Sequence, residues 1–344
     1  MSRIDFADAH DRRTDVRGED GALGRPVGGA HTRCAPGMSP PVAGRRRWLG
    51  AAAAAGVALC LPGRAAHALA NAPILRAIPS TGETLPAIGL GSWVTFNVGN
   101  DSAARAGCTA VIREFLAAGG TLIDSSPMYG SSQEVIGAAL TSLGATARVF
   151  AADKVWTSSG ANGRAQIEES RRRWGVSRFA LLQVHNLLGW QEHLPTLFAM
   201  KAAGLVRYVG ITTSEGRRHR EFVDIMSRHR LDFVQASYNL VDREVEERIL
   251  PLARDRGIAF IANRPFQEGV LLKRLAGRPL PAWAAEIGCA SWAEVALKFI
   301  VSHPAVTCAI PATSRPDHLR ENMRALTGAL PDAALRRRMI AAAE

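Results

Sequence analysis

The sequence has little cysteine and lacks the motifs of several enzyme classes. Five of its 344 residues are cysteine, and Cys108, Cys289 and Cys308 stand too far apart for a disulfide framework or a C-x-x-C metal site. There is also no cluster of metal-ligating residues and no G-x-S-x-G motif, which argues against a metal- or serine-dependent hydrolase. We expect these three cysteines to fill the core, and we expect no metal.

Two further absences narrow the class of protein. The apolar stretch at residues 48–62 is shorter than the ~20 residues that a permanent membrane-spanning helix needs. The segment "GLGSWV" at 89–94 has valine where the dinucleotide-binding fingerprint has its third glycine. Neither an integral membrane protein nor a Rossmann domain is therefore indicated.

The net charge is +11, but the basic residues are not concentrated in one stretch, as a nucleic-acid-binding surface would require. Residues 1–70 carry ten arginines against six acidic side chains, and the charges after them are dispersed, with short clusters at 171–174 and 336–339. Such clusters are typical of solvated helix faces. We expect no nucleic-acid partner.

The first seventy residues differ in kind from the rest. Residues 1–43 have no apolar period, which is typical of a disordered leader or of a segment upstream of a true initiator at Met38. Residues 44–70 resemble a twin-arginine export signal, with paired arginines at 45–46 and an A-x-A cleavage pattern at 68–70. The alternative for this second segment is a frayed, alanine-rich helix. Export implies the twin-arginine translocase as a partner and a periplasmic location, whereas its absence implies a cytoplasmic one.

Residues 71–344 read as one domain in which short apolar runs alternate with segments of helical period. The runs lie at 87–92, 121–126, 148–155, 179–185, 207–213, 233–239, 258–265 and 306–312. Eight strands alternating with helices over about 250 residues favour an α/β fold, the closed parallel (β/α)₈ TIM barrel, over an open sheet. Residues 74–87 predict a β-hairpin that closes the bottom of this barrel.

Polar residues close three consecutive apolar runs. Asp124 ends the second run, Lys154 lies in the third and His185 ends the fourth, while Tyr129 follows Asp124 by five residues. Each alone fits a bland role, such as a capping acid or a hydrogen-bonded core histidine. Because barrel enzymes carry their chemistry at the C-terminal ends of the strands, we expect the four to share one site.

In these motifs the chain resembles the aldo-keto reductase family over nearly all of residues 74–328. The resemblance rests on "LPAIGLGSW", "LIDSSPMYGSSQEVIG", "ADKVW", "QVHN", "GLVRYVGITTS", "FVQASYNL" and "IPATSRPDHLREN". It implies a catalytic tetrad of Asp124, Tyr129, Lys154 and His185. It also implies reduction of an aldehyde or ketone by hydride transfer, with Tyr129 as proton donor.

The charges of the tetrad suggest how it works. A lysine ammonium at hydrogen-bonding range typically lowers the pKa of a tyrosine from ~10 by about 1 to 3 units. Asp124 would keep Lys154 charged and aimed, and His185 would orient the carbonyl oxygen.

The resemblance further implies a nicotinamide cofactor, NADP in preference to NAD. Thr212, Thr213 and Gln235 would hold its carboxamide. Asn263 stands where the family usually has a stacking tyrosine, so Arg264 or Phe266 would cover the ring instead. Arg315, or failing it His318, would contact the 2′-phosphate. The complete set of expected cofactor residues is Ser92, Thr212, Thr213, Gln235, Arg264, Phe266, Thr313, Ser314, Arg315, His318 and Asn322.

An apolar, aromatic substrate pocket is expected above the strands. Its walls would be Trp93, Phe96, Trp156, Leu187, Leu188 and Trp190. We expect a monomer with a wide site for a small carbonyl substrate. A cofactor-binding redox sensor or regulatory subunit without turnover is the alternative, because the stacking residue differs.

Overall fold

The computed structural model describes residues 72–344, so the predicted leader and export signal at 1–70 lie outside the described residues. Within this part of the chain, no helix combines the length and the apolar character needed to cross a membrane.

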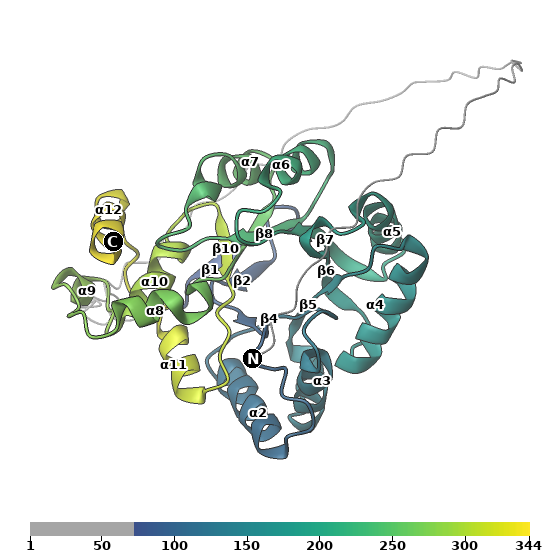
Figure 1. Ribbon diagram of the computed structural model, residues 1–344, viewed down its shortest axis with the longest axis horizontal. Helices are drawn as coiled ribbons and strands as arrows, with labels where there is room; N and C mark the ends of the chain where they lie inside the picture. The colour runs from purple at the N-terminus through teal and green to yellow at the C-terminus, as the bar shows by residue number, and fades with distance from the viewer. Residues whose placement is uncertain (1–71) are drawn as a thin grey trace, which may run out of the picture. The chain divides into compact units, whose positions relative to one another are not determined.

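Eight parallel strands form the centre of the molecule, surrounded by helices (Figure 1). They are β3 (Leu90–Gly91), β4 (Leu122–Asp124), β5 (Phe150–Val155), β6 (Phe179–Val184), β7 (Val206–Thr212), β8 (Phe233–Ser237), β9 (Ala259–Asn263) and β10 (Val306–Ala309). Each strand pairs with the next one along the chain. Parallel bridges from Ile88 to Ala309 and from Gly91 to Ala312 join the two edge strands and close the barrel. The predicted (β/α)₈ barrel is confirmed.

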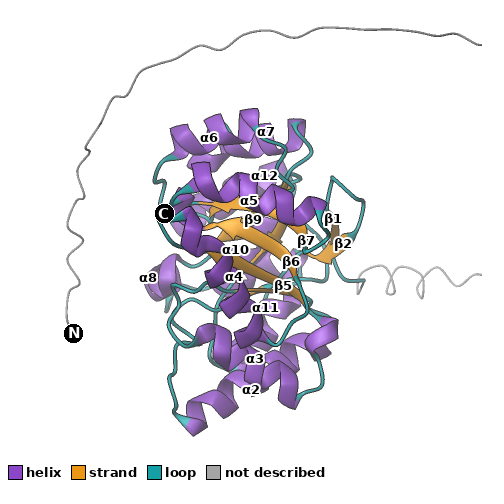
Figure 2. Cartoon of the chain, turned by 90° about the vertical axis from the view of Figure 1, so that its right-hand side faces the viewer, coloured by secondary structure: helices purple, strands orange, loops and turns teal. Residues whose placement is uncertain are grey.

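The predicted hairpin is also present. It consists of β1 (Leu75–Ala77) paired antiparallel with β2 (Thr84–Pro86). Ile78 and Leu85 belong to one buried apolar cluster with Leu122, Phe150 and Phe233, the first residues of β4, β5 and β8. The hairpin therefore covers the end of the barrel at which the strands begin (Figure 2).

The helices pack around the outside of the barrel. They are α2 (Ser102–Ala117), α3 (Ser132–Ser142), α4 (Gly160–Trp174), α5 (Trp190–Ala202), α6 (His219–Arg228), α7 (Ile249–Asp255), α8 (Val270–Leu275), α9 (Trp283–Glu286), α10 (Trp292–Val301), α11 (Pro316–Arg324) and α12 (Ala333–Ala343). Short 3-10 helices lie at Thr146–Arg148 (η1), His185–Leu187 (η2), Glu244–Glu246 (η3) and Gln267–Gly269 (η4).

The side chains of strand β5 contribute to two apolar clusters, one on each face of the strand. Phe150 and Ala152 lie in the cluster that fills the barrel, whereas Ala151 and Val155 lie in the larger cluster shared with the helices. Successive side chains of a strand point to opposite faces. Lys154 is therefore on the barrel side of β5.

Candidate active site

The C-terminal ends of neighbouring strands bring three predicted residues together. Asp124 is the last residue of β4, Lys154 is the penultimate residue of β5, and His185 follows β6 directly. Because parallel strands end on the same side of a barrel, these side chains share one mouth. Tyr129 comes from the loop between β4 and α3.

An ion pair inside the barrel is the centre of this site. The Nζ of Lys154 donates to Oδ1 of Asp124, and the two side chains are 0% and 2% exposed. Nζ also donates to the carbonyl of Ser125 at 2.9 Å. Burial alone would lower the pKa of Lys154, but the Asp124 carboxylate raises it, and the net pKa lies above the ordinary 10.5. The lysine is thus held as an ammonium.

Asp124 is itself held by two side-chain amides, one from β6 and one from β8. Nε2 of Gln235 donates to its Oδ2 at 3.0 Å, and Nε2 of Gln183 approaches the same atom at 3.3 Å. A buried carboxylate needs such donors in addition to its counterion. The amides leave the carboxylate little freedom to turn away from Lys154.

Tyr129 is presented by a tight turn. Its backbone N–H donates to the carbonyl of Ser126 at 3.0 Å, with Pro127 at the second position of the turn, where its fixed φ is favourable. The ring lies 5.0 Å from Nζ of Lys154 and meets the His185 ring edge-on at 5.6 Å. The tyrosine therefore faces both other groups.

The pKa of Tyr129 is shifted upward, whereas the sequence predicted a lowered pKa. Burial raises its pKa above the ordinary 10.0, and the opposing effect of Lys154 is smaller than that of burial. Lys154 still lowers the pKa from the value that burial alone would impose. The phenol is consequently protonated at neutral pH in this structure.

His185 is a neutral imidazole in this environment. Burial and the nearby Lys154 ammonium hold its pKa well below the ordinary 6.5. Its Nδ1 lies 2.8 Å from Oγ of Ser126. Such a ring donates from one nitrogen only, and the other accepts.

The residues expected to hold a carboxamide are buried and engaged with protein groups. Oγ1 of Thr212 accepts the N–H of Asn186 at 3.0 Å, and Oγ1 of Thr213 donates to the carbonyl of Arg217 at 2.5 Å. Gln235 bonds to Asp124, as described above. Ser92 donates to the Asp124 carbonyl at 2.8 Å and so ties β3 to β4.

Asn263, at the usual stacking position, is fixed by hydrogen bonds. Its Nδ2 donates to the carbonyl of Thr213 at 2.9 Å, and its Oδ1 accepts from Oγ of Ser237 at 2.8 Å. Nδ2 also lies 3.4 Å from Oε1 of Gln235. Phe266, one proposed replacement, is half-buried against the main core.

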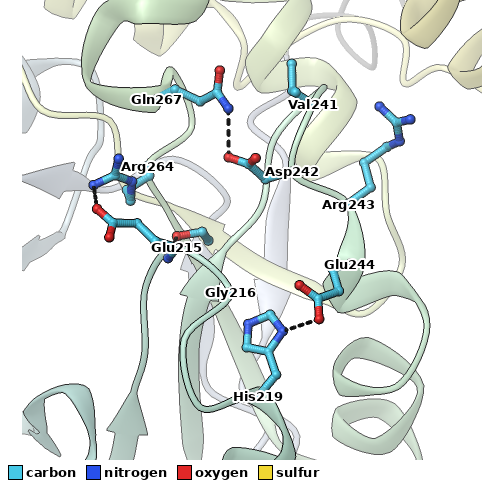
Figure 3. Close-up of a pocket in the computed structure, with 10 residues that line it drawn as sticks. Glu215, Gly216, His219, Val241, Asp242, Arg243, Glu244, Arg264 and Gln267 are labelled. Atoms are coloured by element: carbon cyan, nitrogen blue, oxygen red, sulfur yellow. Dashed lines mark hydrogen bonds and ion pairs between the residues drawn. The ribbon is translucent and has the colours of Figure 1, made fainter.

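A cleft of about 440 Å³ opens next to Asn263, on the loops that follow β7, β8 and β9 (Figure 3). It is lined by Glu215, Gly216, His219, Ser237, Val241, Asp242, Arg243, Glu244, Arg264 and Gln267. Arg264 pairs with Glu215 at 2.7 Å and with Glu268 at 2.6 Å. Its guanidinium is therefore engaged with two carboxylates.

The residues expected at a 2′-phosphate lie around the start of α11. Arg315 is its N-terminal flanking residue and pairs with Asp317 at 2.5 Å. Ser314 and His318 are exposed, whereas Thr313 and Asn322 are buried. Arg315 is 63% exposed, so a ligand could reach it from solvent.

The expected pocket walls fall into three groups by burial. Trp93 and Trp156 are 39% and 37% exposed, and the Trp93 ring lies 4.9 Å from the Tyr129 ring. Phe96 and Leu187 are fully buried in the main core instead. Trp190 packs against the same core and donates to Glu221 of α6, and Leu188 is half-buried. Only Trp93 among these residues contacts the tetrad through a described interaction.

Sequence reasoning missed two residues of this site, Ser126 and Gln183. Gln183 precedes His185 by two positions, so the two-residue period of a strand already puts both on one face. Ser126 stands between Asp124 and Tyr129, before a proline, which is a turn signal. Neither pattern shows which partner the side chain finds.

The fold is a parallel barrel, and its mouth holds a buried ion pair with a tyrosine and a histidine beside it. Comparison with known proteins identifies the family: residues 87–338 match the model of the Aldo/keto reductase family, and the chain belongs to it. The methylglyoxal reductase YeaE of Escherichia coli is 28% identical over 259 residues, which are 73% of this chain and 89% of that protein. The NADH-specific methylglyoxal reductase of the same organism is 26% identical over 313 residues, covering 74% and 94%.

A solved structure is similar in both sequence and fold. The aldo/keto reductase from Klebsiella pneumoniae, in complex with NADP and acetate, has a TM-score of 0.64 and 26% identity. The match covers 75% of this chain and 91% of that chain.

Proposed function

We propose that this protein reduces an aldehyde or ketone to an alcohol with NAD(P)H, and that Tyr129 donates the proton. The observation that carries the proposal is the convergence of the Asp124–Lys154 ion pair, a protonated Tyr129 and a neutral His185 at one barrel mouth. Membership of an oxidoreductase family supports it.

The roles that we propose for Tyr129, Lys154 and Asp124 follow from their charges. When bound, NAD(P)H supplies the hydride that adds to the carbonyl carbon. Tyr129 gives its phenolic proton to the carbonyl oxygen, which would otherwise carry the developing negative charge. Lys154 stabilises the tyrosinate that remains, and Asp124 keeps the ammonium in place. Solvent then returns a proton to Tyr129.

The residues present fit a nicotinamide dinucleotide in charge and in polarity. Arg243, Arg264 and Arg315 follow β8, β9 and β10, so they lie at the same end of the barrel as the tetrad. Arg264 is engaged with two carboxylates, whereas Arg315 is 63% exposed and pairs with one, so Arg315 is the cation that we propose for a phosphate. Gln183 carries a buried side-chain oxygen that has no partner among residues 72–344. An amide N–H, such as that of a carboxamide, is the kind of donor that would satisfy it.

NADP is the cofactor that we propose, with NAD as the alternative. The Klebsiella structure holds NADP, which supports the first, whereas the NADH-specific relative from Escherichia coli supports the second. Two of the relatives are methylglyoxal reductases, so we propose small aldehydes and dicarbonyl compounds as the first substrates to test.

Turnover by the purified protein tests the proposal. NADPH and NADH are each mixed with methylglyoxal and with a panel of aldehydes and ketones, and loss of the reduced cofactor is followed by absorbance. Steady, protein-dependent oxidation with at least one carbonyl is expected. Tight binding of NADPH with no oxidation by any carbonyl would contradict the proposal and favour the redox-sensor alternative, which the fixed Asn263 side chain motivates.

A further inference from the structure

We propose that Ser126 is a positioning residue that fixes the tautomer of His185, so that the proton of the imidazole sits on Nε2. The inference rests on the proposed function for its consequences in turnover, but its geometric basis is independent of it. Oγ of Ser126 lies 2.8 Å from Nδ1 of His185, and the two side chains are 0% and 4% exposed.

The direction of this hydrogen bond follows from the other contact of the serine. The backbone N–H of Met128 donates to Oγ of Ser126 at 3.2 Å, so one lone pair of the hydroxyl is already taken. A hydroxyl has a single proton to donate. Among residues 72–344, Nδ1 of His185 is the one acceptor within reach of that proton. Donation to Nδ1 therefore satisfies the buried hydroxyl, whereas the opposite direction would leave its proton without a partner.

The histidine then has one possible proton position. Its pKa lies well below 6.5 because of burial and the Lys154 ammonium, so the ring carries a single proton. With Nδ1 as acceptor, that proton is on Nε2. No hydrogen bond from the described part of the chain occupies Nε2, so this N–H is free to donate to a carbonyl oxygen beside Tyr129.

Ser126 also connects the two groups that face the substrate. Its carbonyl accepts the backbone N–H of Tyr129 at 3.0 Å, while its hydroxyl holds His185. One residue thus sets the turn that presents the proton donor and the tautomer of the neighbouring ring.

Nitrogen NMR of His185 tests the proposal on the unmodified protein. The spectrum of full-length protein labelled with nitrogen-15 is recorded at neutral pH, and the His185 signals are assigned by their loss in His185→Gln. A protonated Nε2 and an unprotonated Nδ1 are expected. A protonated Nδ1 would overturn the proposal whether or not the protein turns over a carbonyl.

Ser126→Ala provides the second test, with Ser125→Ala as a matched control. Ser125 is equally buried, but its hydroxyl lies 3.0 Å from Oγ of Ser132 and does not contact His185. Ser126→Ala should populate the Nδ1–H tautomer, and kcat/KM for the carbonyl should fall roughly 3- to 10-fold, the range of one neutral hydrogen bond. The dissociation constant for NADPH should stay unchanged, which a general loss of structure would not allow.

The outcomes separate this inference from the proposed function. If Ser126→Ala keeps the Nε2–H tautomer and the parent kcat/KM, the positioning role is refuted. A Nε2–H signal in a protein that reduces no carbonyl would leave the tautomer assignment standing and refute the reductase proposal. If Ser125→Ala changes the tautomer as much as Ser126→Ala does, the assignment to Ser126 is wrong.

Discussion

A buried lysine charge is the residue-scale feature on which the proposed chemistry depends. Lys154 is fully buried, and its charge is matched by a single carboxylate, Asp124, which two amides hold in place. Removing one partner of a buried pair typically costs 3–5 kcal/mol, because the other charge is left uncompensated. The pair therefore supports the local structure as well as Tyr129, the proposed proton donor beside it.

Arg315 is the residue that should decide between the two forms of the cofactor. We expect Arg315→Ala to weaken NADPH binding by roughly 10-fold while changing NADH binding less than about 2-fold, because only NADPH carries the additional phosphate. Arg320→Ala is the control, since Arg320 is also exposed on α11 but pairs with Glu114. Dissociation constants from fluorescence titration measure both. Equal losses of affinity for the two cofactors would show that another group contacts the phosphate, and His318 is the next candidate.

At the scale of elements, strand β5 joins the site to the surrounding helices. Lys154 points into the barrel, and its neighbour Asp153 lies fully buried on the side of the helices. Oδ2 of Asp153 accepts from Gln133 of α3 at 2.7 Å, and Gln133 also donates to Ser170 of α4 at 2.8 Å. Oδ1 accepts the N–H of Lys154 at 2.7 Å. This network connects β5 to two helices.

The Asp153 network should make stability depend on pH. Burial raises the pKa of Asp153 from 3.8 to about 7, although Lys154 and Gln133 oppose the shift. A carboxyl with a raised pKa in the folded state stabilises the fold below its unfolded pKa, and this contribution is lost as pH rises through about 7. The effect should amount to roughly 2–3 kcal/mol between pH 5 and pH 8.

Asp153→Asn tests this expectation, because asparagine cannot be charged. After a flip of the Gln133 amide, its Oε1, which has no partner in the described structure, can accept from the new amide. Urea denaturation at pH 5 and pH 8 should show the variant gaining stability relative to the parent at the higher pH. An unchanged difference between the two proteins at both pH values would show that Asp153 does not titrate in this range.

The strands could be predicted from the sequence, but the loops after them could not. All eight apolar runs overlap β3 to β10, because strands that are buried on both faces appear in the sequence as short apolar runs. Phe96 and Leu187 were expected at the pocket and are in the core. Val94, two residues before Phe96, and Asn186, directly before Leu187, adopt positive φ, at 64° and 51°, which non-glycine residues rarely do and no sequence pattern signals.

At the scale of the whole molecule, the closed barrel brings Gln235 of β8 into contact with Asp124 of β4, two strands that are not neighbours in the sheet. The bridges from Ile88 to Ala309 and from Gly91 to Ala312 complete the ring of strands. The β1–β2 hairpin covers the end of the barrel at which the strands begin. The sequence predicted that the tetrad lies at the C-terminal ends of the strands. It could not predict that burial raises the pKa of Tyr129 by more than Lys154 lowers it, since burial is a property of the folded state. Export through residues 44–70 stays a prediction.

The effect of Tyr129→Phe on turnover is the measurement that tests the central claim most directly. The change removes one hydroxyl and keeps the ring that contacts Trp93 and His185. With the best carbonyl substrate and saturating NADPH, kcat should fall by about 10²- to 10⁴-fold, as expected for loss of a general acid. The dissociation constant for NADPH should stay within about 2-fold, because the hydroxyl acts on the substrate oxygen. A variant that reduces the carbonyl at the parent rate would contradict the assignment of Tyr129 as the proton donor.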